Sequence, residues 1–505
     1  MPGPQALLAE RVRAAITGAF GSQHSGADPL IRPSAFADFQ SNAALPLATV
    51  LRRSPREVAR EIAAHIDLAG ICETPEISGP GFLNFTLASS WIATEATRLL
   101  DDRRLGVRPA GQAQAVVVDY SGPNVAKELH VGHLRATAVG DAVVRILEFL
   151  GHTVTRAAHL GDWGTQFGML IEHLLDTGEA AAHAQLAAGE LTAFYQAAHA
   201  RFDSGPIFAE RSRRRVSCLQ SGDTQTLRLW RMLVSESMDY LTRIYARLDI
   251  TLSAIDMAPE SFYNDMLAGV CAELQDAGIA RMSEGALCAF PPGFTGREGT
   301  PLPLMLRKID GGYGYGTTDV AAIRYRLVDL KANRLIYVVG AEQAQREQIA
   351  EAVGIGALKY ADLSVARHSS YAFDVGRMLA MTGDTGPYLQ YATARIRSIF
   401  RRAGTSPDDA AGPILVTEDA ERALALVMLG FGTAVWQAAD RAEPHVLAGF
   451  LFRVASAFTA FFEQCPVLRA ASEPVRESRL ALSALTLRVL ATGLGLLGVP
   501  VPERM

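Results

Sequence analysis

Two histidines, His130 and His133, stand three residues apart where the sequence passes from an expected strand to an expected helix. At this spacing both imidazoles lie on one face of a helix. Gly132 between them would let a flat base or a phosphate approach the backbone closely. A helix N-terminus at such a turn is an anion site, so two imidazoles there could donate to phosphate oxygens and stabilise charge that develops in a transition state. The alternative is a pair of surface or capping histidines on an ordinary helix.

The elements around these histidines predict a βαβ unit. Ala115–Tyr120 is a short run typical of a buried strand, and His130–Leu150 has the apolar spacing of a helix, which Gly151 would cap. Val154–Ala158 is the next expected strand. Strand, helix and strand within about 40 residues predict a parallel sheet with a right-handed crossover.

The chain as a whole is expected to be α/β plus all-α, in three domains. The first is a small α/β domain at 1–112, with expected helices at Ala6–Phe20 and from Pro55, and a strand signal at Ile77–Leu87. The second, at 113–345, contains the βαβ unit and a mainly helical insertion. The third, at 346–505, has helical periodicity almost throughout.

Composition excludes several classes of protein. The 505 residues are 49% hydrophobic and 20% charged, which excludes disorder for most of the chain. The five cysteines form no C-x-x-C pair, so neither a disulfide scaffold nor a metal site is expected. No secretion signal and no 18-residue uncharged apolar stretch are found, so we expect a cytoplasmic protein with no membrane partner. The net charge of −5 gives no global basic field, and no DNA partner is expected.

The segment Val118–Arg135, which contains both histidines, closely resembles the ATP signature of class I aminoacyl-tRNA synthetases, and specifically of the arginyl-tRNA synthetases. Leu160–Gly168 is similar to the segment that follows in that family. The resemblance implies a Rossmann-type catalytic domain in which His130, Gly132 and His133 bind ATP. It assigns catalysis to the two histidines.

The resemblance extends to both ends of the chain and implies a tRNA partner. Phe36–Asn42 and Gly79–Phe85 are similar to the family's N-terminal module, which grips the outer corner of tRNA. Gly383–Tyr391 and Val501–Met505 resemble the helical anticodon-binding domain. The residues that would touch the D-loop are Phe39, Gln40 and Asn42, and those that would line the anticodon stem are Arg395, Arg397, Arg401 and Arg402. The alternative for these arginines is a solvated helix face.

A further stretch, Lys308–Asp319, resembles the family's arginine-selecting segment. The resemblance places Tyr315 and Asp319 against a guanidinium group. Gln343 would line the same pocket, while Asp119 and Asn124 would hold the α-amino and carboxylate end of the substrate. A carboxylate suits a planar cation with five donors. Alternatively, Asp319 only caps the helix that follows it.

One family feature is missing from the sequence. Class I synthetases carry a mobile K-M-S-K-S-type loop whose lysine neutralises ATP phosphates, but here Gln343 runs almost directly into a helical pattern that starts at Arg346. Compared with the family, a block of roughly seventy residues is absent, so the Rossmann domain is expected to be truncated. None of the four lysines (Lys127, Lys308, Lys331 and Lys359) lies in such a loop. Lys127 matches a position where many arginyl enzymes carry a compensating lysine, which makes it a third candidate for catalysis and phosphate binding.

Three functions fit these observations. The favoured hypothesis is a tRNA-dependent aminoacyl transferase that moves an aminoacyl group from charged tRNA to an amine on a guanidinium-bearing small molecule. This would resemble the amide-forming enzymes of nucleoside antibiotic pathways of the blasticidin S type and would need no cofactor. The second hypothesis is an arginine–tRNA ligase that uses ATP with Mg²⁺. The third is a non-catalytic tRNA-binding paralogue. The sequence indicates neither the acyl group nor the oligomeric state.

Overall fold

The computed structural model describes residues 3–123, 125, 129, 131–163, 165–187, 190–290, 303–309, 311–339, 359–366, 378, 380 and 382–503. The chain divides into two compact units. One contains residues 1–110 together with 350–505, and the other contains residues 111–349. The two ends of the sequence therefore belong to one unit.

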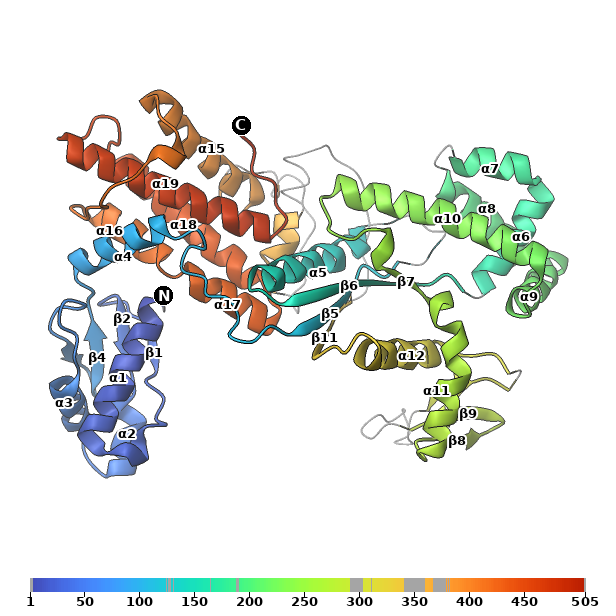
Figure 1. The fold of residues 1–505 in the computed structure, drawn as a ribbon, viewed down its shortest axis with the longest axis horizontal. Coiled ribbons are helices and arrows are strands. Elements are labelled where there is room, and N and C mark those ends of the chain that lie inside the picture. Colours follow the sequence, from blue (N-terminus) through green and yellow to red (C-terminus); the bar gives the residue numbers. More distant parts are fainter. Residues whose placement is uncertain are drawn as a thin grey trace. The chain divides into compact units, whose positions relative to one another are not determined.

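The N-terminal part of the first unit is a small antiparallel sheet covered on one face by three helices (Figure 1). The strand order is β1-β2-β4-β3. Leu8, Val12, Leu83 and Phe85 lie at the centre of its buried core. The elements are α1 (Pro4–Phe20), η1 (Ser22–His24), β1 (Ile31–Pro33), β2 (Phe39–Ser41), α2 (Ala44–Leu51), α3 (Pro55–His65), β3 (Glu76–Ser78) and β4 (Phe82–Phe85).

The predicted helix from Pro55 is confirmed as α3, and its start has a clear local cause. The Ser54 hydroxyl accepts a hydrogen bond from the Glu57 amide, and the Glu57 side chain accepts from the Ser54 amide. This reciprocal capping satisfies two donors that a helix N-terminus leaves open.

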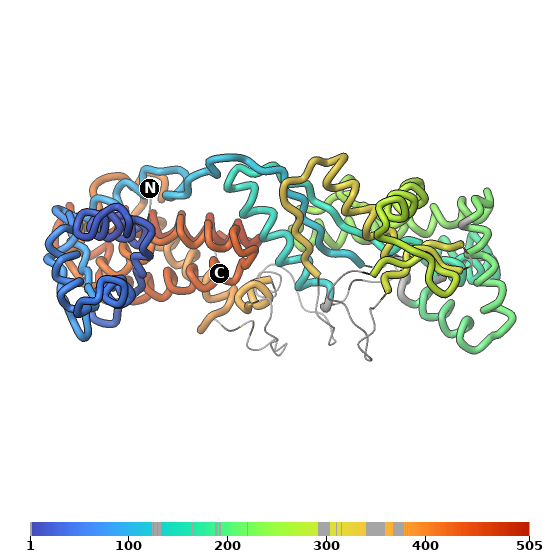
Figure 2. The backbone as a smooth tube through the Cα atoms, turned by 90° about the horizontal axis from the view of Figure 1, so that it is seen from below, coloured from blue at the N-terminus to red at the C-terminus, as the bar shows by residue number. Residues whose placement is uncertain are grey.

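The rest of the first unit is a helical bundle, as the sequence predicts. The long helices α18 and α19 lie against each other (Figures 1 and 2), and α4 from the N-terminal part packs on α16 and α19. The elements are α4 (Ser89–Asp101), α15 (Gly386–Ala403), η4 (Pro407–Asp409), α16 (Asp419–Met428), α17 (Phe431–Arg441), α18 (Pro444–Gln464) and α19 (Glu473–Leu496).

Three stretches of this bundle are long and apolar enough to cross a membrane, by length and composition alone. In the stretch that forms α19, 78% of the most apolar window is buried inside the protein. The apolar side chains of α18 and α19, such as Leu451, Leu485 and Leu490, serve the core of the bundle. The three stretches are Asp419–Arg441, Pro444–Gln464 and Glu473–Leu496.

The second unit is built on a parallel sheet with the order β11-β5-β6-β7. The strands are β5 (Ala115–Tyr120), β6 (Thr153–Leu160), β7 (Met257–Pro259) and β11 (Arg334–Val338), and α5 (Val131–Phe149) connects β5 to β6. The predicted βαβ unit is therefore confirmed. The strand β6 continues two residues past the predicted end at Ala158, which brings His159 and Leu160 into the sheet.

The helix α5 approaches β5 closely because Gly140 has no side chain. A Cβ atom on Gly140 would lie 2.3 Å from the Cβ atom of Tyr120, inside the van der Waals contact limit. The fully buried carboxylate of Asp141 anchors the same helix. It accepts hydrogen bonds from Arg145 and from the amide and hydroxyl of Thr251. This packing fixes the middle of α5 against the end of β5.

The remaining elements of the second unit are mainly helices inserted between β6 and β11. The basic run at Arg211–Arg215, on α9, is paired internally: Arg211 and Arg215 bind the buried Glu172, and Arg211 also binds Asp176. The elements are α6 (Thr165–Thr177), α7 (Glu179–Ala187), α8 (Leu191–Ser204), α9 (Pro206–Gln220), α10 (Thr224–Arg247), η2 (Ala254–Asp256), η3 (Glu260–Tyr263), α11 (Asn264–Asp276), β8 (Ala280–Ser283), β9 (Ala286–Ala289), β10 (Leu304–Arg307) and α12 (Tyr315–Val328).

Candidate functional site

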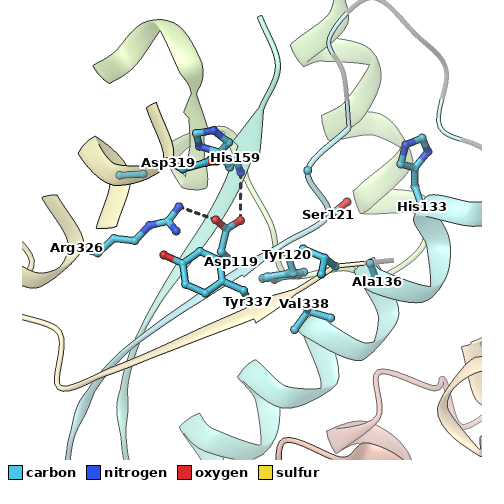
Figure 3. Close-up of a pocket in the computed structure, with 13 residues that line it drawn as sticks. Asp119, Tyr120, Ser121, His133, Ala136, His159, Asp319, Arg326, Tyr337 and Val338 are labelled. Carbon is cyan, nitrogen blue, oxygen red and sulfur yellow. Dashed lines mark hydrogen bonds and ion pairs between the residues drawn. The ribbon is translucent and has the colours of Figure 1, made fainter. Parts of the chain in front are cut away.

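A cavity of about 400 Å³ opens at the carboxyl ends of β5, β6 and β11 (Figure 3). In open parallel sheets this edge is the usual place for a ligand. Side chains from α5 and α12 complete the wall. The lining residues are Asp119, Tyr120, Ser121, Gly122, His133, Ala136, His159, Asp319, Ala322, Arg326, Tyr337, Val338 and Val339.

Asp119 and Arg326 form an ion pair in the wall of the cavity. The Arg326 Nη2 atom lies 2.7 Å from Asp119 Oδ2, and the Arg326 side chain is only 2% exposed. The second carboxylate oxygen accepts from the backbone amide of His159 at 3.4 Å. The Arg326 guanidinium also stacks over the Tyr337 ring, 5.2 Å from its centroid. The charge of Asp119 is therefore compensated from within the protein.

Asp319, on the first turns of α12, is the second carboxylate of the cavity. No described side chain forms a hydrogen bond or an ion pair with it. Burial raises the pKa of this carboxyl group, and the negative charge of Asp119 raises it further, against the opposing influence of His159 and Arg326. An incoming cation would relieve this cost, so Asp319 is placed to bind a positively charged group.

Two buried polar atoms at this site have no hydrogen-bond partner among the described residues: Nδ1 of His159 and Nη2 of Arg326. The latter contacts Asp119 closely but without hydrogen-bond alignment. Burial lowers the pKa of His159, although Asp119 and Asp319 oppose this. Unsatisfied buried polar atoms are rare in folded proteins, so their presence in one cavity indicates a site for a polar ligand.

The chain leaves β5 through a strained turn. Ser121 has φ of 55°, a left-handed conformation that is uncommon for a residue with a side chain. Its hydroxyl is held by Tyr245 at 2.8 Å and by Thr137 at 2.6 Å. A Cβ atom on the following Gly122 would lie 2.7 Å from the His159 carbonyl. These contacts lead the chain over the sheet edge toward α5.

The structure places four of the predicted site residues at this turn and cavity. Asp119, His133 and Asp319 line the cavity, with His133 and Arg326 on opposite sides of Asp119 (Figure 3). Gly132 lies in the first turn of α5, next to His133. Tyr315 is the first residue of α12, which carries Asp319. Four further predicted residues, Asn124, Lys127, His130 and Gln343, lie outside the described residues.

The sequence prediction did not include three charged groups near this site: His159, Glu260 and Arg326. Burial, together with the charge of Asp162, raises the pKa of Glu260 to about 7. Asp162 is itself fully buried and accepts from the amide and hydroxyl of Ser261. His159 stands at the carboxyl end of an expected strand, which was a usable signal. Glu260 and Arg326 carried no sequence signal of comparable strength.

The residues predicted to touch the tRNA corner lie on β2 and just after it, in the first unit. The Phe39 side chain packs partly against the core. Gln40 lies on the opposite face of the sheet, where its amide donates to Asn42 Oδ1 at 2.6 Å. The partner strand places Asn84 directly opposite Gln40. Gln40 and Asn42 are therefore the partly exposed amides here, whereas the Asn84 side chain is buried and donates to the Ser78 hydroxyl. Together these three residues form the amide face of the sheet.

The four predicted anticodon-stem arginines all lie on α15. Arg395 stacks over the rings of Tyr391 and Phe462. Arg397 and Arg401 donate to backbone carbonyls of the C-terminal segment, at Pro502 and Glu503. Arg402 is exposed. Part of this basic face therefore holds the end of the chain in place.

Three family models match this chain. The catalytic domain of the class I tRNA synthetases for arginine matches residues 95–348. The DALR anticodon-binding domain matches residues 389–505, and the arginyl-tRNA synthetase N-terminal domain matches residues 6–87.

Relatives and solved structures agree with these matches over the full chain. The chain is 52% identical to an arginine–tRNA ligase of Thermobifida fusca and 40% identical to one of Edwardsiella ictaluri, with at least 99% of each chain covered. Its fold matches the crystal structure of arginyl-tRNA synthetase from Plasmodium falciparum with a TM-score of 0.86, at 26% identity and complete coverage of both chains. The Thermus thermophilus arginyl-tRNA synthetase gives a TM-score of 0.76 at 23% identity, with 99% of this chain and all of that chain covered.

These relatives correct the favoured functional hypothesis. The transferase hypothesis is wrong, because a chain that is 52% identical to an arginine–tRNA ligase over its whole length supports the ligase hypothesis instead. The hypothesis was wrong because the expected loss of the K-M-S-K-S-type loop was given more importance than the resemblance of the rest of the chain to the ligases. The expected role in nucleoside antibiotic synthesis depended on the transferase hypothesis, so it is not supported either.

Proposed function

Because this chain belongs to the class I arginyl-tRNA synthetase family, we propose that it is an arginine–tRNA ligase, which uses ATP to join L-arginine to tRNA(Arg). The observation that carries the proposal is the carboxylate of Asp319, which forms no ion pair with any described side chain and lies in a cavity at the carboxyl ends of the strands. Asp119 is already paired with Arg326, so among the described residues of the cavity it is Asp319 that is open to a cation.

The cavity suits arginine better than a neutral amino acid. A guanidinium can donate two parallel hydrogen bonds to one carboxylate, and this geometry favours Asp319 as its partner. Tyr315, on the same helix, is the second residue that we assign to the guanidinium. Asp119 keeps the role predicted for it at the α-amino end, together with Asn124 and Gln343, although its pairing with Arg326 makes it the weaker contact.

The reaction has two steps, and the chain's groups act on both. In the first, an arginine carboxylate oxygen attacks the α-phosphorus of ATP and pyrophosphate leaves. In the second, a ribose hydroxyl of the tRNA attacks the adenylate carbonyl carbon and AMP leaves. His133 at the start of α5 faces the cavity, where it can donate to a phosphate oxygen as negative charge grows. His130 and the backbone at Gly132 complete this anion site in the proposal.

The cations that balance the ATP phosphates are a separate part of the proposal. The alignment with the Thermobifida relative runs over 577 positions, whereas this chain has 505 residues, so part of the alignment has no counterpart here. We place the gap between Gln343 and Arg346, where the sequence lacks the lysine-bearing loop. Lys127 then supplies the protein's positive charge, and Mg²⁺, bound mainly through the phosphates, supplies the rest.

The tRNA partner is supported by the match to an anticodon-binding domain. In the proposal, the amide face of the N-terminal sheet, with Gln40 and Asn42, grips the tRNA corner, and Phe39 supports that face from the core side. The exposed arginines of α15 contact the phosphates of the anticodon stem electrostatically in the proposal, and Arg402 is the main one.

A charging assay with three amino acids tests the proposal. With ATP and purified tRNA(Arg), arginine should be esterified to the tRNA, whereas citrulline, a neutral analogue of similar shape, and lysine should be rejected by at least about 10³-fold in kcat/KM. Rejection of citrulline follows from the loss of the charge that Asp319 requires. Equal use of arginine and citrulline would refute the assignment of the pocket.

A further inference from the structure

An ion pair links the N-terminal sheet to the helical bundle within the first unit. Arg422, on α16, donates to both carboxylate oxygens of Asp38, from Nη1 at 2.8 Å and from Nη2 at 2.6 Å. Asp38 lies in the loop that enters β2, almost 400 residues away in the sequence. The Asp38 side chain is 10% exposed and that of Arg422 is 22% exposed. Asp38 also raises the pKa of Arg422, which stays charged.

The guanidinium of Arg422 also binds the chain just after a second strand, β4. Arg422 Nη2 donates to the Leu87 carbonyl at 2.7 Å, while the Leu87 amide donates to Asp38 Oδ2 at 2.8 Å. Leu87 lies two residues after the end of β4. One arginine of the bundle therefore fixes the point where β2 begins and the point where β4 has ended. Planar, paired hydrogen bonds of this kind fix orientation as well as distance.

The loop that is fixed in this way borders the amide face of the sheet. Phe36, two residues before Asp38, is 88% exposed, and its backbone amide donates to the Ser34 hydroxyl at 3.1 Å. Gln40 follows Asp38 by two residues and faces Asn84 across the strands. Ser34 in turn contacts Asn84 at 3.4 Å. An exposed aromatic ring near the partly exposed amides of Gln40 and Asn42 is a suitable surface for an unstacked RNA base.

We propose that Arg422 is a positioning residue for tRNA, which orients the Phe36 loop and the amide face relative to the anticodon-binding helices through Asp38. This inference rests on the proposed function, because it assumes that both surfaces bind one tRNA. Arg422 itself touches neither the reacting atoms nor the RNA. Its effect is to set the two surfaces at the spacing that one rigid tRNA requires.

Other contacts keep the two parts joined when Arg422 is changed. The Thr97 hydroxyl accepts from the Ile414 amide at 2.9 Å, and Arg488 donates to the Asp102 carbonyl at 2.7 Å. The Trp436 indole donates to the Arg108 carbonyl at 3.1 Å. Removal of the Asp38 pair should therefore alter orientation without detaching the N-terminal part.

The test compares Arg422→Lys with the wild-type chain in steady-state charging, at saturating arginine and ATP. Lysine keeps the charge but cannot donate to both carboxylate oxygens and to Leu87 at once. The KM for tRNA(Arg) should rise about tenfold, with kcat and the KM for arginine within twofold of wild type. The penalty for substituting nucleotides at the tRNA corner should shrink in the variant, because the corner is already poorly held. The charge swap Asp38→Arg with Arg422→Asp should recover part of the loss seen in Arg422→Asp alone.

Arg479→Lys is the matched control, since Arg479 pairs with the buried Glu421 next to Arg422 but lies wholly within the bundle. It should lower thermal stability and leave the corner penalty unchanged. The same response in Arg422→Lys, with lower stability and an unchanged KM for tRNA, would overturn the inference. A direct measurement of tRNA binding distinguishes failure of this inference from failure of the proposed function. A wild-type chain that binds tRNA but never charges it would refute the ligase. The Kd for tRNA of Arg422→Lys, compared with that of the wild type, would still test the role of Arg422.

Discussion

At the scale of single residues, the proposed selection of arginine depends on the difference between two aspartates in one cavity. Asp119 has a guanidinium partner in Arg326, whereas Asp319 forms no ion pair with any described side chain. A carboxylate whose pKa is raised by burial gains most from an added cation, because the cation offsets the cost of desolvation. The arrangement leaves one place for the guanidinium of a substrate.

The variant Asp319→Asn should raise the KM for arginine by about 10²-fold, because it removes a charged, paired hydrogen bond worth about 1.5–3 kcal/mol. Steady-state charging over a range of arginine concentrations measures the change. Asp329→Asn, just beyond the end of the same helix and exposed, is the control and should behave as wild type. A KM in Asp319→Asn within twofold of wild type would contradict the assignment.

Glu260 should make stability depend on pH. Its folded-state pKa of about 7 lies above the ordinary value of 4.5, so the folded chain holds more protons than the unfolded chain between these values. This group therefore costs stability as the pH rises from about 4.5 to 7. Glu260→Gln removes the cost, and its free energy of unfolding relative to wild type should increase from pH 5 to pH 8. Urea unfolding at both pH values measures this, and a difference that does not change with pH would contradict the assigned pKa.

At the scale of elements, the position of His133 depends on how closely α5 approaches β5. Gly140 permits that approach, since a Cβ atom there would lie 2.3 Å from Tyr120. The strained turn at Ser121 begins the connection, and the buried Asp141 anchors the middle of α5. The proposed anion site therefore depends on the packing of α5 as well as on the histidines assigned to it.

Gly140→Ala should lower the free energy of unfolding by about 1–3 kcal/mol, because the helix must move away from the strand. It should also lower kcat, since α5 carries His133. Gly269→Ala on α11 is the matched control: nothing lies within 4 Å of its added Cβ, so the change should stabilise the chain by about 0.5–1 kcal/mol. Urea unfolding and charging assays measure both effects. Wild-type stability in Gly140→Ala would show that the close approach is not required.

Much of the fold was predictable at this scale because the signals are local. The apolar run at Ala115–Tyr120 and the periodicity after His130 predicted β5, α5 and β6 almost to the residue. The pairing of Asp119 with Arg326 was not predictable, because it joins positions about 200 residues apart and only the fold brings them together. Asp319 came from the family resemblance rather than from spacing. Glu260 depends on burial, which a short polar segment does not reveal.

At the scale of the whole molecule, the two ends of the sequence fold into one unit. The N-terminal sheet and the helical bundle share the contacts made by Arg422, Arg488 and Trp436. Sequence resemblance identified both parts as tRNA-binding modules but could not show that they pack together. The functional error also arose at this scale, because a missing loop was weighed above the likeness of the complete chain.

The gap that we propose after Gln343 would give the molecule one expected weakness. If Lys127 supplies the protein's charge for the ATP phosphates, Lys127→Ala should raise the KM for ATP or lower kcat by about 10²-fold. The KM for tRNA should change little. Charging kinetics at varied ATP concentration measure the effect, with Lys331→Ala as the control away from the cavity. An unaltered Lys127→Ala enzyme would show that another group balances the phosphates.

The most direct test of the ligase is a count of turnovers. Purified protein, ATP, Mg²⁺, arginine and a large excess of tRNA(Arg) should yield many molecules of arginyl-tRNA for each protein chain, with one AMP released for each. Omission of ATP or arginine should abolish the product. A preparation that binds both tRNA and arginine but forms no arginyl-tRNA would contradict the account.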